Sequence, residues 1–99
     1  MNSISSIAGS GIKAATQGLA ASAHNVANLA TAGFRPQQAV QAEQPGGGVT
    51  ASVAPTGQDG TDLAAETVRR MTLVYAFKAN LRSIEVETEM SRALIDARA

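Results

Sequence analysis

Large aromatic side chains are scarce in this 99-residue chain, which has two Phe, one Tyr and no Trp. Much of its 44% hydrophobic content is alanine, so each buried residue removes little apolar surface from water. A chain of this length is also close to the size at which a single core becomes marginal. We therefore expect a long, thin helical protein that packs against neighbours rather than a self-sufficient globule.

The charge balance and the absence of cysteine exclude several classes of function. Eight basic and eight acidic side chains give a formal net charge of zero, which supplies no footprint for nucleic acid or an anionic membrane. Without cysteine, disulfides and thiolate metal sites are excluded. No apolar run approaches the roughly 20 residues that a membrane span needs, so we expect no membrane insertion. The start, Met1 to Ile7, lacks the basic and apolar regions of a Sec signal peptide.

The N-terminal segment has apolar and small residues at alternating spacings of four and three, which predicts a helix with a coiled-coil seam as far as about Leu29. The seam positions are Ala8, Ile12, Ala15, Leu19, Ser22, Val26 and Leu29. A stripe of small residues runs beside them, at Gly11, Ala15, Gly18 and Ser22. Such a stripe would let a second helix approach closely. Gly33 and Pro36 end the segment, because glycine tolerates positive φ and proline favours extended geometry in the residue before it.

The middle and the C-terminal segment differ sharply in composition. Residues 36–61 are rich in Gly and Pro, which predicts a flexible linker, with a short extended piece near Val49–Val53. Thr61 or Asp62 is placed to cap a second helix, and no Gly or Pro interrupts the chain from there to residue 99. Val74, Phe77, Leu81 and Ile84 continue the four-three seam.

These patterns predict an all-α fold. Two long terminal helices would pack as an antiparallel hairpin or coiled coil, joined by a flexible Gly/Pro-rich linker. The expected parts of this one domain are an N-terminal helix and turn motif over 1–35, the linker over 36–61 and the C-terminal helix over 62–99.

Catalytic chemistry has little support in the sequence. His24 is the only histidine, and there is no cysteine to act with it. Glu85, Glu87 and Glu89 are spaced by two, which scatters them around a helix instead of gathering them as metal ligands. The Gly-rich runs lack the preceding strand and the following Lys-Ser/Thr of a phosphate loop. We expect no enzyme activity, no cofactor and no metal.

A string of residue types at fixed spacings occupies the first 35 residues. It comprises Ser10-Gly11-Ile12, Leu19, Asn25-Val26-Ala27-Asn28, Thr31 and Gly33-Phe34-Arg35. The string resembles the N-terminal signature of the flagellar axial proteins, the family of rod, hook and hook-associated proteins. That signature reads Ser-Gly-aliphatic, then Leu, then Asn-(Ile/Val)-Ala-Asn-x-x-Thr-x-Gly-aromatic-basic.

The other end of the chain is similar to the C-terminal motif of the same family, in which an aromatic-x-Ala-Asn is followed by an aliphatic residue and a late Glu-Met. The matching residues are Ala76-Phe77-Lys78-Ala79-Asn80, Ile84, Glu89-Met90 and Leu94-Ile95. Two departures stand out. The large β-rich domains of hook and distal-rod members are replaced by the short segment 36–61, and Leu73-Val74-Tyr75-Ala76-Phe77 replaces an Ala-Gln-Arg-Ala-Tyr-like run. The resemblance therefore implies a small rod-type member or a degenerate relative of the family.

The resemblance implies a structural subunit of the flagellar basal-body rod, which spans the periplasm. Such a subunit would leave the cytoplasm through the flagellar type III system without a cleaved signal peptide, and its N-terminal segment would carry the export signal. Its partners would be other rod and axial subunits, the export apparatus and further copies of itself. The expected interface residues are Ile12, Leu19, Asn25, Val26, Asn28, Thr31, Gly33, Phe34, Val74, Phe77, Asn80, Leu81, Ile84 and Met90.

A second hypothesis is compatible with the same residues. A cytoplasmic adaptor or regulatory helical hairpin could mimic the axial termini and bind the export machinery. Detection in purified basal bodies would favour the rod subunit, whereas detection only in the cytosol would favour the adaptor.

Overall fold

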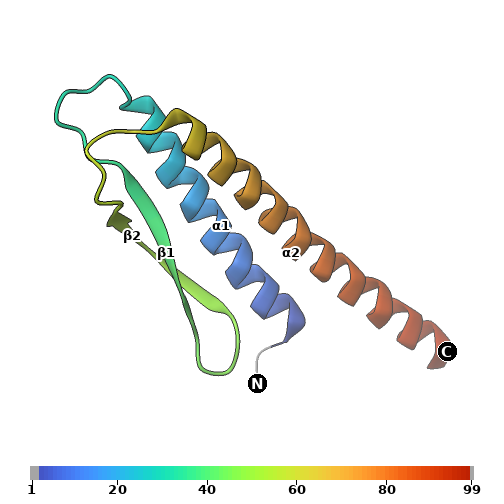
Figure 1. Ribbon diagram of the computed structural model, residues 1–99. Helices are drawn as coiled ribbons and strands as arrows, with labels where there is room; N and C mark the ends of the chain where they lie inside the picture. Colours follow the sequence, from blue (N-terminus) through green and yellow to red (C-terminus); the bar gives the residue numbers. More distant parts are fainter. Residues whose placement is uncertain (1–2, 99) are drawn as a thin grey trace.

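The computed structural model describes residues 3–98; Met1, Asn2 and Ala99, which belong to the predicted export segment and C-terminal helix, lie outside the described residues. The elements in chain order are α1 (Ile4–Ala27), β1 (Gln37–Glu43), β2 (Val49–Pro55) and α2 (Leu63–Arg98). The two helices lie antiparallel and side by side, with both strands next to α1 (Figure 1). The molecule is elongated, with extents of 64 × 25 × 14 Å.

The prediction of an all-α fold with a flexible linker over 36–61 is wrong, because that segment forms a β-hairpin. β1 and β2 pair in antiparallel register, with Gln37 opposite Pro55 and Glu43 opposite Val49. Gly46, Gly47 and Gly48 all have positive φ, between 86° and 106°, and make the turn between the strands. Three glycines thus lie together where the chain reverses. The residues on either side of them are nearly uncharged and can adopt the extended conformation of a strand. The short extended piece expected near Val49–Val53 is confirmed, since it lies within β2.

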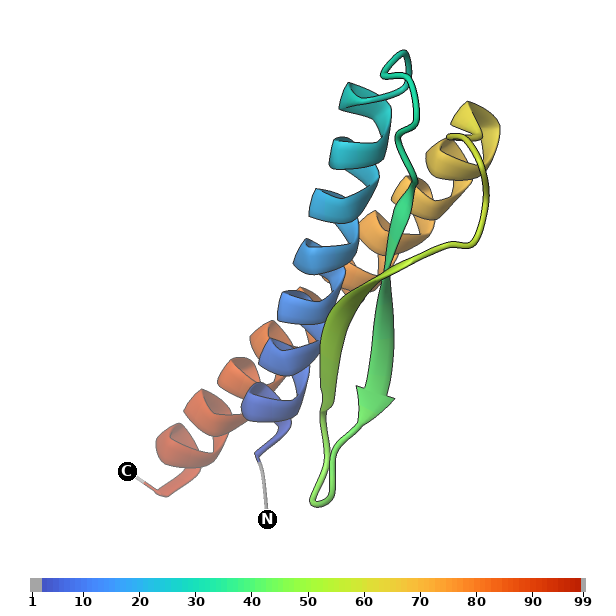
Figure 2. The ribbon, with the colours of Figure 1, turned by 90° about the vertical axis from the view of Figure 1, so that its left-hand side faces the viewer.

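α1 is the middle layer of the molecule. It contacts α2 on one side and both strands on the other, and the hairpin does not pack on α2 within residues 3–98 (Figure 2). Because α1 is covered from two directions, its small residues are the ones that become buried. The buried apolar side chains of α1 are all alanines, namely Ala8, Ala14, Ala15 and Ala21, and Pro36, just before β1, is also fully buried.

Local hydrogen bonds fix the helix ends. The Ser3 hydroxyl accepts from the Ser6 amide at 3.0 Å and caps α1. The Asp62 carboxylate accepts from the Ala65 amide at 3.2 Å and starts α2, as expected of an N-terminal cap at Thr61 or Asp62. α1 ends at Ala27, two residues before the predicted end at Leu29.

α2 is much longer than its partner, with 36 residues against 24 in α1. Glu87 accepts a hydrogen bond from Ser5, close to the start of α1. Every residue from 88 to 98 is exposed, and this part of α2 extends past the end of α1 (Figure 1). We call residues 88–98 the overhang.

Candidate functional site

The two helices approach closely because glycines of α1 face larger side chains of α2. A Cβ placed on Gly11 would lie 2.6 Å from Nδ2 of Asn80, and one placed on Gly18 would lie 2.8 Å from Cδ2 of Leu73. Both distances are too short for real atoms. The glycines of the small-residue stripe therefore accommodate side chains of α2, within the same chain.

A buried polar cluster ties α1, the hairpin and α2 together at one point. The Asn25 side chain, which is fully buried, pairs with the backbone of Gln37: its amide donates to the Gln37 carbonyl at 2.7 Å and its carbonyl accepts from the Gln37 N–H at 2.8 Å. The same amide donates to Oε1 of Glu66 at 2.9 Å. The Thr61 hydroxyl donates to the backbone carbonyl of Asn25 at 3.2 Å. One side chain thus positions the first residue of β1 and the first turn of α2.

Glu66 is the one residue of α2 that is buried within the described chain, and it remains a carboxylate there. Desolvation by burial raises its pKa, but hydrogen bonds from Ser22 and Asn25 and the charge of Arg69 outweigh that penalty and lower the pKa below its usual value. Arg69 donates to Oε1 at 2.6 Å. Ser22 Oγ and Glu66 Oε2 are both buried without a hydrogen bond of regular geometry, so their interaction is a weaker polar contact than the bonds to Oε1.

The turn motif that follows α1 in the sequence reverses the chain, so that the hairpin can pack on α1. Asn28 closes the helix by donating to the His24 carbonyl at 2.9 Å, and Thr31 donates to the Asn28 side chain at 3.2 Å. Gly33 has a φ of 75°, and the Phe34 ring meets His24 edge-on at 5.2 Å. Intramolecular contacts therefore account for these motif residues without a neighbouring subunit.

The remaining predicted interface residues separate into two groups. Ile12, Leu19, Val26, Phe77, Asn80 and Ile84 are half-buried. Val74, Leu81 and Met90 are exposed, with Met90 keeping 67% of its surface in contact with solvent. Of the first group, Asn80 lies against Gly11 of α1, whereas the second group lies on the surface of α2.

The face of α2 that points away from α1 holds a row of large apolar side chains. Leu73, Asn80 and Glu87, spaced by seven residues, mark the side that meets α1. The opposite side shows Val68, Met71, Tyr75 and Val86, all at least 36% exposed. We call these four residues the outward row. Tyr75 was not among the interface residues predicted from the sequence, although its spacing from Val68 and Met71 was a usable signal.

Part of the outward row lies in a shallow apolar groove of about 340 Å³. Met71, Val74 and Tyr75 line it, with Arg70 and Lys78 at its sides. Neither Arg70 nor Lys78 takes part in an ion pair within residues 3–98. The groove therefore combines an open apolar surface with two unpaired positive charges.

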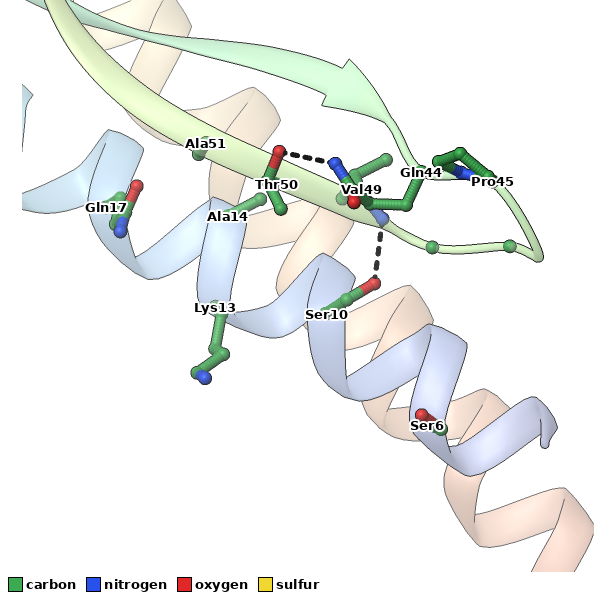
Figure 3. Close-up of a pocket in the computed structure, with 12 residues that line it drawn as sticks. Ser6, Ser10, Lys13, Ala14, Gln17, Gln44, Pro45, Val49, Thr50 and Ala51 are labelled. Atoms are coloured by element: carbon green, nitrogen blue, oxygen red, sulfur yellow. Dashed lines mark hydrogen bonds between the residues drawn. The ribbon is translucent and has the colours of Figure 1, made fainter. Parts of the chain in front are cut away.

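A larger cavity, of about 440 Å³, lies between α1 and the turn end of the hairpin. Ser10 accepts from the Val49 amide at 3.0 Å across this gap, and Gln44 donates to Thr50 at 2.9 Å along its wall (Figure 3). Lys13 is its one charged residue among those described, and its side chain extends away from the hairpin (Figure 3). These contacts fasten the hairpin to α1.

Metal-binding and membrane-spanning features are both absent from residues 3–98. No group of three or more His, Cys, Asp or Glu side chains there is arranged to hold a metal ion. Neither described helix is long and apolar enough to cross a membrane.

Comparison with known proteins adds no relative. No protein-family model matches the chain, and no curated protein is significantly similar to it.

Proposed function

We propose that this protein is a structural subunit of the bacterial flagellar basal-body rod, exported by the flagellar type III system and assembled through its helices. The two sequence motifs that resemble those of the axial family are the reason for proposing the flagellar rod as the assembly. The observation that carries the proposal is the outward row of α2, because four large apolar side chains on one face of a 36-residue helix lack cover in the monomer.

The shape of the molecule supports assembly by lateral packing. A thin rod-like subunit offers most of its surface along its length, so neighbouring copies can cover the outward row and the overhang. Met90, Leu94 and Ile95 of the overhang are each about two thirds exposed, and they point to different sides of the helix. A helix with apolar residues on more than one side is stable when it lies between neighbours.

The intramolecular roles of Asn25, Asn28 and Gly33 change the expected interface. These residues hold the monomer together, so the assembly contacts are assigned to α2: Met71, Val74, Tyr75, Met90 and Leu94. Substituting them should impair assembly without unfolding the subunit.

Location of the protein in purified basal bodies tests the proposal. We expect the protein in the rod fraction and expect Leu94→Glu, which adds a charge to the apolar surface of the overhang, to be exported but not incorporated. Gln41→Glu, at an exposed position of β1, is the matched control and should incorporate normally. Retention of the native protein in the cytosol, bound to export components, would instead support an adaptor that mimics axial termini.

A further inference from the structure

The hairpin has two outer edges, and the alternation of an antiparallel ladder determines which backbone groups face them. The Gln44 N–H donates to the Gly48 carbonyl at 3.0 Å at one end of the hairpin, and the Thr56 N–H donates to the Pro36 carbonyl at 3.0 Å at the other. Both bonds continue the register of the strands, and bonded pairs in such a ladder recur at every second residue. The even-numbered residues of β1 therefore bond to β2, and the N–H and C=O groups of its odd-numbered residues point outward.

Side chains of α1 agree with this alternation at one end of each edge. Asn25 bonds to both backbone groups of Gln37 on the outer edge of β1, and the Ser10 hydroxyl accepts from the Val49 N–H on the outer edge of β2. Near the turn, β2 lies between α1 and β1 (Figure 2). The hairpin therefore crosses α1 at an angle, and the β1 edge faces away from α1 near the turn.

Most of the β1 edge is open. The outward backbone groups of Ala39, Gln41 and Glu43 have no hydrogen-bond partner within the described chain, and every residue from 40 to 43 is exposed. An open edge can bond to another strand, and proteins commonly protect such edges with proline, lysine or a bulge. The β1 edge from 39 to 43 has none of these, since its register with β2 is continuous.

Less of the β2 edge is available for pairing. Its outward residues are Val49, Ala51, Val53 and Pro55, of which the first already donates its N–H to Ser10 and the last has no N–H. The β1 edge is therefore the better site for an added strand.

We propose that two copies of this chain form a dimer by antiparallel pairing of their β1 edges about a two-fold axis at Gln41. In this arrangement, Gln41 lies opposite Gln41 of the second copy, and Ala39 lies opposite Glu43 of the second copy. Each of these outward pairs exchanges two hydrogen bonds, so the open backbone groups of the edge all gain partners.

The occupant of the edge is a second copy because the edge is complementary to itself. Val40, which is 45% exposed in the monomer, lies opposite Ala42 of the second copy, so apolar side chains cover one another. Glu43 is the one charged residue of β1, and the antiparallel pair keeps the two Glu43 side chains roughly 13 Å apart at about 3.3 Å per residue. A parallel pair in register would place Glu43 on Glu43, which is destabilising.

The dimer preserves the contacts of the monomer. The turn after Gln44 takes the second chain back toward its own β2, so the pairing ends before it reaches the bonds between Asn25 and Gln37. The two hairpins become one sheet with both β1 strands at its centre, and a hairpin of two strands gains stability from added strands.

This dimer does not depend on the proposed rod function. It uses the hairpin and leaves the outward row and the overhang of α2 free. Gln41→Glu should therefore lose the dimer and still be incorporated into the rod.

Opposite charges at position 41 test the pairing, because Gln41 is the residue of β1 that meets its own copy. Gln41→Glu and Gln41→Lys should each associate about fivefold more weakly than native protein, since like charges then face each other at the axis. An equal mixture of the two variants should recover the native affinity as a heterodimer. Sedimentation equilibrium measures each dissociation constant.

Ser52→Glu and Ser52→Lys, at an exposed position of β2, are the matched controls and should associate like native protein, alone or mixed. Ser52 would meet its own copy if the β2 edges paired, so weakening by these variants and recovery on mixing would overturn the proposal. Gln41 variants that associate like native protein, or a mixture no tighter than either variant alone, would also refute it. So would native protein that stays monomeric at its highest soluble concentration.

Single cysteines test the direction of the strands, because the native chain has none. Under mild oxidation, Gln41→Cys should form a disulfide with itself readily, since directly opposite residues of a sheet lie within disulfide range. Glu43→Cys should form one slowly alone and readily when mixed with Ala39→Cys. Self-linkage of Glu43→Cys as fast as that of Gln41→Cys would indicate parallel pairing and overturn the proposal. Absence of the protein from basal bodies would refute the rod function and leave these results unchanged.

Discussion

α1 and α2 lie side by side, yet α1 buries seven residues, all small or polar, whereas α2 buries Glu66 alone within residues 3–98. The large apolar side chains show the reverse distribution, since most of those on α2 remain exposed. In an ordinary globular domain, large apolar residues fill the core. Here the monomer is held by close backbone approach and one polar cluster, and most large apolar side chains of α2 lie on the surface.

This contrast assigns different consequences to substitutions on the two helices. Changes on the buried side of α1 should affect the stability of the monomer. Changes on the outward row of α2 should affect association and leave the monomer almost unchanged, because exposed substitutions away from special features usually alter stability by less than about 0.5 kcal/mol.

The largest effect is expected at Asn25. Asn25→Ala removes the partners of the Gln37 backbone and one partner of the Glu66 carboxylate, so it should destabilise the protein by about 3 kcal/mol, as buried unsatisfied polar groups do. Asn28→Ala is the matched control: Asn28 is half-buried and donates to one helix-terminal carbonyl, so its loss should cost about 1 kcal/mol. Urea unfolding followed by circular dichroism measures both. Equal losses for the two variants would contradict the central role of the buried cluster.

A smaller effect, with opposite signs at two sites, is expected for glycines of α1. Gly18→Ala should destabilise the protein by roughly 1–2 kcal/mol, because the added methyl group meets Leu73. A methyl group on Gly9 would meet nothing within 4 Å among the described residues, so Gly9→Ala should stabilise α1 by about 0.5–1 kcal/mol through helix propensity. Thermal unfolding of both variants decides the point. If Gly18→Ala were also stabilising, the close approach of the helices would be looser than the structure has it.

The smallest effect is expected from acidification. Burial raises the pKa of Glu66, but Ser22, Asn25 and Arg69 together lower it below the usual carboxyl value. A carboxylate whose pKa is lower in the folded state contributes stability above its unfolded pKa, and that stability is lost as the pH falls through the folded pKa. Native protein should therefore lose stability in this acidic range.

Glu66→Gln removes the titrating group and isolates its share of the pH dependence. The variant should be less stable than native protein at neutral pH, and the difference in the free energy of unfolding should shrink on acidification. Glu85→Gln, at a position exposed on α2, is the control and should follow the native pH profile closely. A difference between native and Glu66→Gln protein that does not change with pH would contradict the proposed ionisation of Glu66.

The sequence by itself determined both helices, the cap at the start of α2 and the stripe of small residues, because these depend on local spacing and composition. Gly11 and Gly18 stand out in sequence as positions of close approach. The sequence does not say which side chains lie against this stripe. Only the tertiary structure shows that Asn80 and Leu73 of the same chain contact these glycines.

Only the tertiary structure decided the course of residues 36–61 and the roles of the motif asparagines. Gly and Pro indicate a break in helix, but whether the chain beyond them is mobile or paired depends on strand register and on a surface to pack against, here α1. Asn25 looks like a helix-terminal polar residue in sequence. Its bonds to Gln37 and Glu66 join positions 12 and 41 residues away, and contacts over such separations follow from the packing of the elements and not from local pattern.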